Sequence, residues 1–175
     1  WDEHVREALK VSNETNLKII EDSIAYLKAN GLQVFFDAEH FFDGFATNKE
    51  YALAVLNSAK KAGASTLVLC DTNGGVLSSD IYQITKEVIK NVPGIEIGIH
   101  THNDCDMAVA NSIAAVEAGA THIQGTINGM GERCGNANLI SIIPILELKG
   151  EGLCPSIPTE NLAQLTGVAS YVAEI

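Results

Sequence analysis

The sequence predicts an α/β fold in which about four parallel strands alternate with helices. Short continuous apolar runs rich in Val, Ile, Leu and Phe recur along the chain. They lack strict polar alternation, as is typical of strands covered on both faces. Amphipathic stretches with a helical period lie between these runs. Successive strand ends are about 30 residues apart, which is the length of a unit made of one strand and one crossover helix.

Each element is predicted from its own pattern. The four apolar runs predict strands over residues 33–37, 66–71, 95–100 and 122–126. The amphipathic stretches predict helices over residues 14–30, 48–62, 79–91, 106–118 and 138–149. Four of these helices are followed by a glycine, the residue that most readily adopts the left-handed conformation that ends a helix. These glycines are Gly31, Gly63, Gly119 and Gly150.

The chain is predicted to form one unit over residues 1–175. No Pro- or Ser-rich linker divides it, and its length is ordinary for a single domain. A closed eight-stranded (β/α)₈ barrel takes at least about 200 residues, whereas only four strands are evident here. We therefore predict a partial TIM barrel, about half of the closed form. The chain begins at Trp1 without a Met, as expected of a fragment of a longer protein.

Composition excludes several classes of partner. The formal net charge is −11, from 22 acidic and 11 basic residues, so the chain lacks the positive field that nucleic acids and anionic membranes attract. No apolar run approaches the roughly 20 residues of a membrane-spanning helix. The four cysteines form no C-x-x-C pair, which predicts reduced thiols in a cytoplasmic protein. These cysteines are Cys70, Cys105, Cys134 and Cys154.

Polar residues follow each predicted strand, and in parallel α/β folds reactive groups gather at the carboxyl ends of the strands. His100 and His102 are two residues apart, so in an extended segment both imidazoles lie on one side and can meet one cation. They are the leading candidates for metal ligands, although a His-x-His pair can also be structural or merely exposed. The adjacent Asn103 and Asp104 could accept hydrogen bonds that orient the ligands.

Three further polar residues have both a functional and a structural interpretation. Glu39 could act as a base or orient a substrate, or it could be a solvated loop acid. The Thr72 hydroxyl could bind a carboxylate or cap the next helix. Asn136, in the glycine-rich segment GMGERCGN, could offer an oxygen to a metal or cap a helix. Cys134 has no identifiable base partner and His122 lies within a strand, so neither is assigned a role.

Four segments together resemble the 2-isopropylmalate, homocitrate and citramalate synthases of the DRE-TIM metallolyase superfamily. The segments are FDAEHFFDG (36–44), LCDTNGG (69–75), GIHTHND (98–104) and GTINGMGERCGNANL (125–139). They lie in order along nearly the whole chain, and the first is most like the citramalate synthase branch. The resemblance implies an HMGL-like catalytic domain of the pyruvate carboxyltransferase type, a TIM barrel of which this chain would supply strands 5–8.

The resemblance also implies the site residues. It implies a divalent metal, Zn²⁺, Mn²⁺, Mg²⁺ or Co²⁺, bound by His100, His102 and Asn136. It assigns Glu39 as the catalytic glutamate. The residues that it assigns to substrate binding are Thr72, Asp37 and Arg133. The family's first-strand arginine and metal-binding aspartate are not in this chain, so the chain alone is expected to be inactive.

The implied reaction is a Claisen condensation. The metal binds a 2-oxo acid and polarises its ketone, a base removes a methyl proton from acetyl-CoA, and the resulting enolate attacks the carbonyl carbon. Acetyl-CoA is then the co-substrate. The expected acceptor is pyruvate, and next 2-oxoisovalerate, in branched-chain amino-acid biosynthesis.

Two alternatives stay open on the sequence alone. One is a lyase, aldolase or carboxyltransferase relative with the same fold. The other is a non-catalytic half-barrel that serves assembly. A sheet of four strands has two open edges, which invite pairing with another chain. We therefore expect a homo-oligomer, at least a dimer.

Overall fold

The computed structural model describes residues 1–150 and 157–175. Its centre is a parallel sheet of four strands in the order β1-β2-β3-β4. The strands are β1 (Phe35–Ala38), β2 (Thr66–Asp71), β3 (Glu96–Thr101) and β4 (His122–Gln124). The predicted fold class and all four strands are confirmed. The end of the fourth strand was predicted wrongly, because β4 stops at Gln124 and not at residue 126.

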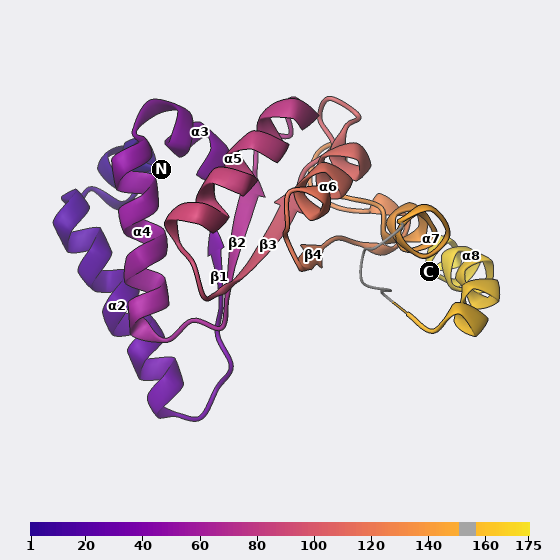
Figure 1. Ribbon diagram of the computed structural model, residues 1–175, viewed down its shortest axis with the longest axis horizontal. Coiled ribbons are helices and arrows are strands. Elements are labelled where there is room, and N and C mark those ends of the chain that lie inside the picture. The colour runs from indigo at the N-terminus through magenta and orange to yellow at the C-terminus, as the bar shows by residue number, and fades with distance from the viewer. Residues whose placement is uncertain (151–156) are drawn as a thin grey trace.

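Helices connect the strands and follow the order of the sheet across the molecule, from α2 and α4 beside β1 to α7 and α8 at the far end (Figure 1). The α-helices are α1 (Asp2–His4), α2 (Asn13–Ala29), α3 (Phe41–Thr47), α4 (Lys49–Ala62), α5 (Ser78–Asn91), α6 (Ala108–Glu117), α7 (Leu139–Lys149) and α8 (Leu165–Glu174). The shorter helical segments are η1 (Val5–Leu9), η2 (Ile127–Gly129) and η3 (Thr159–Gln164).

The five predicted helices form within two residues of their expected bounds. Gly31, Gly63 and Gly119 have positive φ angles of 78°, 104° and 112°, so these three left-handed ends are confirmed. Gly150 was predicted wrongly, because its φ is −82°. The Gly150 amide donates to the Leu146 carbonyl, four residues earlier, as α-helical amides do. The helix therefore ends without a residue in the left-handed conformation.

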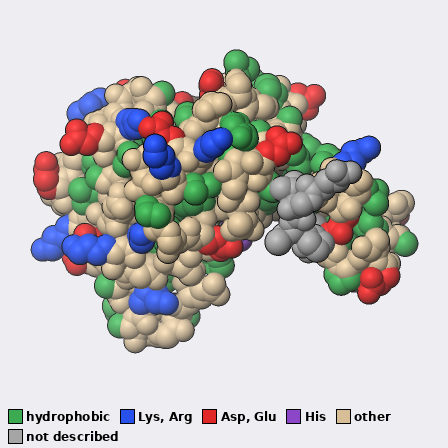
Figure 2. Space-filling model, viewed as in Figure 1, with side chains coloured by type: hydrophobic (Ala, Val, Ile, Leu, Met, Phe, Trp, Pro, Cys, Tyr) green, Lys and Arg blue, Asp and Glu red, His purple; other side chains and the backbone are tan. Residues whose placement is uncertain are grey.

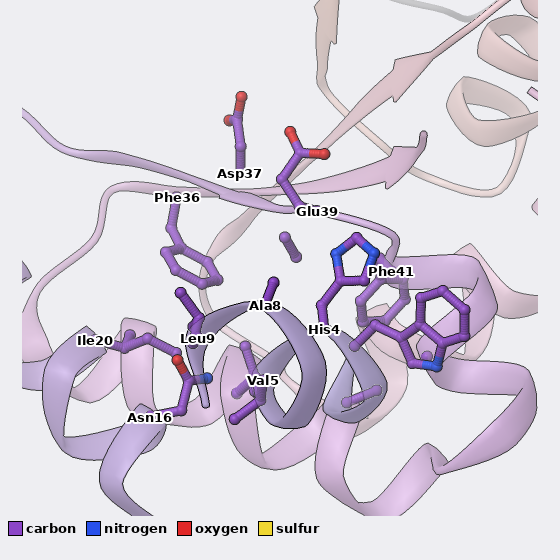
Figure 3. Close-up of a pocket in the computed structure, with 15 residues that line it drawn as sticks. His4, Val5, Ala8, Leu9, Asn16, Ile20, Phe36, Asp37, Glu39 and Phe41 are labelled. Carbon is purple, nitrogen blue, oxygen red and sulfur yellow. The ribbon is translucent and has the colours of Figure 1, made fainter. Parts of the chain in front are cut away.

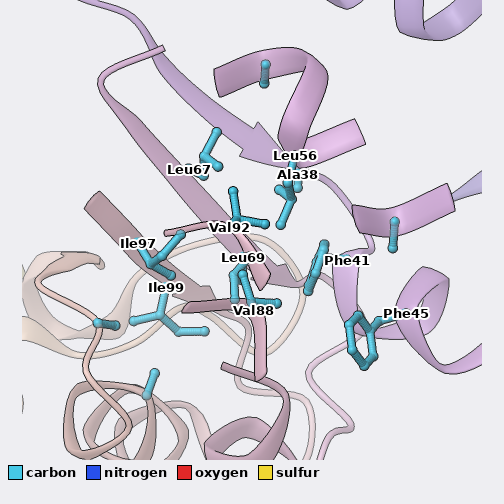
Figure 4. Close-up of a cluster of buried hydrophobic side chains, with 14 of the residues drawn as sticks. Ala38, Phe41, Phe45, Leu56, Leu67, Leu69, Val88, Val92, Ile97 and Ile99 are labelled. Atoms are coloured by element: carbon cyan, nitrogen blue, oxygen red, sulfur yellow. The ribbon is translucent and has the colours of Figure 1, made fainter. Parts of the chain in front are cut away.

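The core lies between the outer face of the sheet and the helices. All six residues of β2 are buried, as expected of a strand with a neighbour on either side. Leu67 and Leu69 of β2 share one apolar cluster with Leu56 of α4 and Val88 of α5 (Figure 4). Burying each such side chain stabilises the fold by roughly 1.5–3 kcal/mol. Packing of α4 and α5 therefore fixes the position of the central strand.

The sheet curves strongly. Its edges β1 and β4 are three strand spacings apart, each about 4.8 Å in a flat sheet. Nevertheless Asp37 of β1 accepts a hydrogen bond from Gln124 of β4 at 2.9 Å. The ring of Phe35 also stacks on His122, with centroids 5.2 Å apart. Side chains of opposite edges can meet only if the sheet bends around their common face. The chain thus forms an open partial barrel, as predicted.

The structure shows where the thiols and the charged side chains lie. Cys105 and Cys134 are exposed free thiols, and Cys70 is buried; burial raises the pKa of the Cys70 thiol far above its ordinary value. Cys154 lies outside the described residues. On the face shown in Figure 2, Lys and Arg side chains are scattered among acidic ones. Within the described ranges, no helix is both long and apolar enough to cross a membrane.

Candidate active site

The candidate site lies on the concave face of the sheet, at the carboxyl ends of the strands. His100 of β3 is in register with Gln124 of β4. Side chains alternate along a strand, and Figure 3 shows Asp37 and Glu39 projecting from one side of β1 while Phe36 projects from the other. The contact of Asp37 with Gln124 shows that this side of β1 faces the same space as β4. One face of the sheet therefore carries the polar strand ends.

The two histidine rings lie side by side. The centroids of His100 and His102 are 5.1 Å apart, with 36° between the ring planes. His102 is only 8% exposed. Burial lowers the pKa of His102, and the neighbouring His100 lowers it further. A lowered pKa favours the neutral imidazole, which is the form that binds a metal. The two rings are therefore neighbours, and their binding of one cation stays a prediction.

Asn136 lies against His102, with which it forms an isolated antiparallel bridge. The Nδ1 atom of His102 and the Oδ1 atom of Asn136 are buried and have no hydrogen-bond partner within the described residues. An unpaired buried polar atom costs about 1–3 kcal/mol. A third such atom is the Thr85 hydroxyl, which lies apart in α5. The two lone pairs of His102 and Asn136 suit a bound cation.

The donor set fits a divalent metal. Two imidazoles and an amide oxygen are acceptable to Zn²⁺, Mn²⁺ and Co²⁺, while Mg²⁺ prefers oxygen. Throughout the part of the chain that the structure describes, no group of three or more His, Cys, Asp or Glu side chains could hold a metal ion. This chain would therefore supply His100, His102 and Asn136, and the remaining ligands would come from other groups.

Close backbone contacts fix the position of Asn136. Its amide donates to the Gly129 carbonyl at 3.0 Å, so the glycine-rich segment folds back on itself. Gly135 has a φ of 101°, and a Cβ atom there would lie 2.2 Å from the Gly129 oxygen. A Cβ atom on Gly131 would lie 2.8 Å from the Asn136 side chain. A side chain at position 135 would displace the backbone of Gly129, and one at position 131 would displace the Asn136 side chain, so both positions need glycine.

The capping interpretation of Asn136 is wrong. The helix that follows, α7, begins at Leu139, and its N-cap is Asn138, whose side chain accepts a hydrogen bond from the Ile140 amide. The capping interpretation of Thr72 is wrong for the same kind of reason, since α5 begins only at Ser78. Both side chains are therefore available to the site.

Glu39 and Thr72 form the second part of the site. The Thr72 hydroxyl donates to Oε2 of Glu39 at 3.0 Å and accepts from the His40 amide at 2.8 Å. His40 has a φ of 52°, and this left-handed residue turns the chain from β1 into α3. Its ring lies 3.1 Å from the Asp43 carboxylate, which also accepts from Asn73 at 2.8 Å. Glu39 is exposed, and the hydrogen bond from Thr72 holds its carboxylate in place.

Arg133 and Asp37 contact other protein groups. Nε and Nη2 of Arg133 donate to the two oxygens of Asp104 at 2.9 and 3.0 Å, and Nη2 donates to the Thr72 carbonyl at 2.6 Å. The hydrogen bonds from Arg133 lower the pKa of the Asp104 carboxyl. Asp37 accepts from Gln124. The Arg133 contacts tie the glycine-rich loop to the ends of β2 and β3.

Two features of the site were missed by sequence reasoning. Gln124 is the polar residue at the end of β4, and the wrong boundary of that strand at Thr126 concealed it. A cluster of Trp1, His4 and His40 lies beside Glu39, with the two histidine rings 4.2 Å apart. Trp1 and His4 also line a cavity of ≈ 290 Å³ between β1 and the N-terminal helices (Figure 3). Local sequence carries no signal for contacts between such distant residues.

Comparison with known proteins identifies the family. The model for the HMGL-like family matches residues 2–172. The chain belongs to the HMGL-like family. The predicted family is therefore confirmed.

Among HMGL-like relatives, the (R)-citramalate synthase of Aquifex aeolicus is 56% identical over 100% of this chain and 33% of its own length. That of Geobacter sulfurreducens is 52% identical with the same coverage. The chain thus spans about a third of the length of these relatives. The HMG-CoA lyase of Bacillus subtilis has a TM-score of 0.77 at 20% identity, over 99% of this chain and 60% of that one, which shows a shared fold.

Proposed function

We propose that this chain is part of the catalytic barrel of an acyltransferase that joins acetyl-CoA to a 2-oxo acid. The proposed acceptor is pyruvate, which gives citramalate for branched-chain amino-acid biosynthesis, and the next candidate is 2-oxoisovalerate. The observation that carries the proposal is the pair of buried, unpaired atoms on His102 and Asn136 beside the His100 ring. Similarity to (R)-citramalate synthases supports the choice of pyruvate.

In this proposal His100, His102 and Asn136 hold a divalent cation. Zn²⁺, Mn²⁺ and Co²⁺ suit two imidazoles better than Mg²⁺ does. When bound, the cation polarises the ketone of the 2-oxo acid. Burial lowers the pKa of His102, which favours the neutral imidazole that acts as a metal ligand.

Glu39 is the proposed base that removes a proton from the acetyl methyl group. Its Oε2 atom accepts a hydrogen bond from Thr72. A hydroxyl has a single hydrogen, so Thr72 can donate to Glu39 or to the carboxylate of the 2-oxo acid, but not to both. When Thr72 turns to the substrate, the Glu39 carboxylate loses a hydrogen bond that stabilises its charged form, which favours transfer of the methyl proton to it. Substrate binding would therefore activate the base.

Arg133 has a supporting role in this proposal. Asp104 and the Thr72 carbonyl already occupy the Nε and Nη2 sides of its guanidinium. An arginine that must bind a substrate carboxylate with two nitrogens needs a free edge. We therefore assign Arg133 to holding the loop that carries Asn136, and the 2-oxo acid carboxylate to Thr72.

The test is CoA release by the full-length protein from acetyl-CoA with pyruvate, 2-oxoisovalerate or 2-oxoglutarate. We expect release to be fastest with pyruvate and to be lost on chelation of divalent metals. Asn136→Ala removes a proposed direct ligand, so it should lower the rate by at least the roughly 10–100-fold that loss of an outer-shell partner costs. The matched control is Asn57→Ala, at an exposed position of α4, which should leave the rate unchanged. No release with any of the three acids would refute the proposal.

We further propose that the protein is a cytoplasmic homo-oligomer. The free thiols Cys105 and Cys134 support a reducing compartment, since exposed cysteines persist unpaired there. Taken alone, this chain leaves the sheet edges β1 and β4 unpaired, and unpaired strand edges favour pairing with a second copy. Sedimentation of this 175-residue chain at micromolar concentration should show at least a dimer, and a strictly monomeric species would contradict this.

A further inference from the structure

Gln124 connects two polar residues from strands that are not neighbours. Its Nε2 atom donates to Oδ1 of Asp37 on β1 at 2.9 Å, and its Oε1 atom lies 2.8 Å from Nδ1 of His100 on β3. Gln124 and His100 are half-buried on the concave face. The three side chains therefore form one chain of hydrogen bonds, Asp37 to Gln124 to His100, across the floor of the candidate site.

The chemistry of these groups fixes the direction of every hydrogen bond. An ionised carboxylate only accepts hydrogen bonds, so the amide nitrogen of Gln124 must face Asp37. The amide oxygen then faces His100, and because this oxygen also only accepts, Nδ1 of His100 must carry a hydrogen. In a neutral imidazole the other nitrogen, Nε2, is then left with its lone pair.

We propose that Gln124, held by Asp37, is a positioning residue that fixes His100 in the form with hydrogen on Nδ1, so that Nε2 is presented to the cation. This inference rests on the proposed function, since it concerns the same metal ligands. A hydrogen-bond acceptor behind a metal-binding histidine sets both the ring orientation and the nitrogen that binds. Here the acceptor is an amide, and a carboxylate one step further away sets the orientation of that amide.

The arrangement also explains why an acidic residue stands at position 37. A carboxylate facing an anionic 2-oxo acid would repel it, which disfavours direct substrate binding by Asp37. A carboxylate is well suited to the role proposed here, because it accepts from Gln124 and cannot donate to it. Asparagine at position 37 could present either its oxygen or its nitrogen, so Gln124 could turn over and His100 could exchange its hydrogen between the two ring nitrogens.

The first measurement is metal affinity, by Co²⁺ titration of the metal-free full-length protein. Gln124→Met removes the acceptor and should weaken binding by roughly 10–100-fold. The double variant Asp37→Asn with Gln124→Glu exchanges the amide and the carboxylate, and so keeps an acceptor facing His100. The Co²⁺ affinity of this double variant should be within about threefold of the wild-type affinity, well short of the roughly 10–100-fold loss expected for Gln124→Met. The control is Gln83→Met, at an exposed glutamine of α5.

The second measurement is the position of the ring hydrogen of His100 in the metal-free protein labelled with [¹⁵N]histidine. Nuclear magnetic resonance should show hydrogen on Nδ1 in the wild type and the double variant, and a shift toward Nε2 in Gln124→Met. A merely structural link between β1 and β4 would not move this signal.

The outcomes separate the two proposals. If the wild type binds no Co²⁺, the proposed function fails and this inference fails with it. If the wild type binds Co²⁺ and Gln124→Met binds it equally well, only the role of Gln124 is overturned. If Gln124→Met does not fold, the double variant decides: a folded double variant that loses affinity or carries hydrogen on Nε2 of His100 overturns the inference.

Discussion

The loop that carries Asn136 is held by a glycine that has both a left-handed φ angle and no room for a side chain. Three Gly→Ala variants separate the cost of the φ angle from the cost of the close contact. Gly135 has positive φ and no room for a side chain, Gly31 has positive φ in open space, and Gly75 has open space without positive φ. An alanine with left-handed φ costs about 1–2 kcal/mol. Forcing a methyl group into a filled site costs about 1–3 kcal/mol more, and the Cβ of residue 135 would lie 2.2 Å from the Gly129 oxygen.

The expected costs are therefore about 2–5 kcal/mol for Gly135→Ala, about 1–2 for Gly31→Ala and within about 0.5 for Gly75→Ala. Native-state hydrogen exchange of the full-length protein measures these costs locally. The reporters for Gly135 are the amides of Asn136 and Ala137, which donate to the carbonyls of Gly129 and Thr101. Their exchange should accelerate by roughly 30-fold to several thousand-fold, since each 1.4 kcal/mol is tenfold.

Either of two results would refute this reasoning. If exchange at Asn136 and Ala137 is unchanged in Gly135→Ala, the close approach to Gly129 does not hold the loop. If Gly31→Ala accelerates exchange around Leu32 as much as Gly135→Ala does around Asn136, the contact adds nothing to the cost of the dihedral angle.

Three other variants test the core and the site. Leu67→Ala should lower the free energy of unfolding by about 2–5 kcal/mol, because Leu67 is fully buried in the core. Urea unfolding measures this loss, and a value under about 1 kcal/mol would contradict the packing described for Leu67. Thr72→Val should raise the KM for the 2-oxo acid while Thr72→Ser restores it, since only the hydroxyl donates; equal KM values in steady-state kinetics would exclude Thr72 from substrate binding. Arg133→Lys should weaken Co²⁺ binding, because lysine cannot bridge both oxygens of Asp104 and so holds the loop that carries Asn136 less firmly. Calorimetry that shows an unchanged Co²⁺ affinity would contradict the role of Arg133 in holding this loop.

Most of the fold was accessible from the sequence because its signals are local. Helical periodicity and the glycines at positions 31, 63 and 119 mark helix ends within a few residues of sequence. The short helix α3 was missed, because its seven residues, FFDGFAT, span only about two turns and include Gly44, which is too little sequence for a helical period to be detected. The strand β4 is only three residues long, so its true end at Gln124 has no pattern of its own.

The site was accessible only in part. His100 and His102 lie on one strand, so their shared direction follows from the period of two. The partners of Asp37 and Arg133 are 87 and 29 residues away in the chain, and no local pattern joins such residues. Only the curvature of the sheet brings Asp37 to Gln124.

Each strand of this sheet pairs only with its neighbours in the sequence. A closed barrel built in this way can be divided between any two of its strand-helix units with the loss of just two backbone ladders, one at the division and one at the original seam. Two half-barrels expressed as separate polypeptides could therefore restore the closed ring by forming those two ladders, which makes this architecture well suited to fragment complementation.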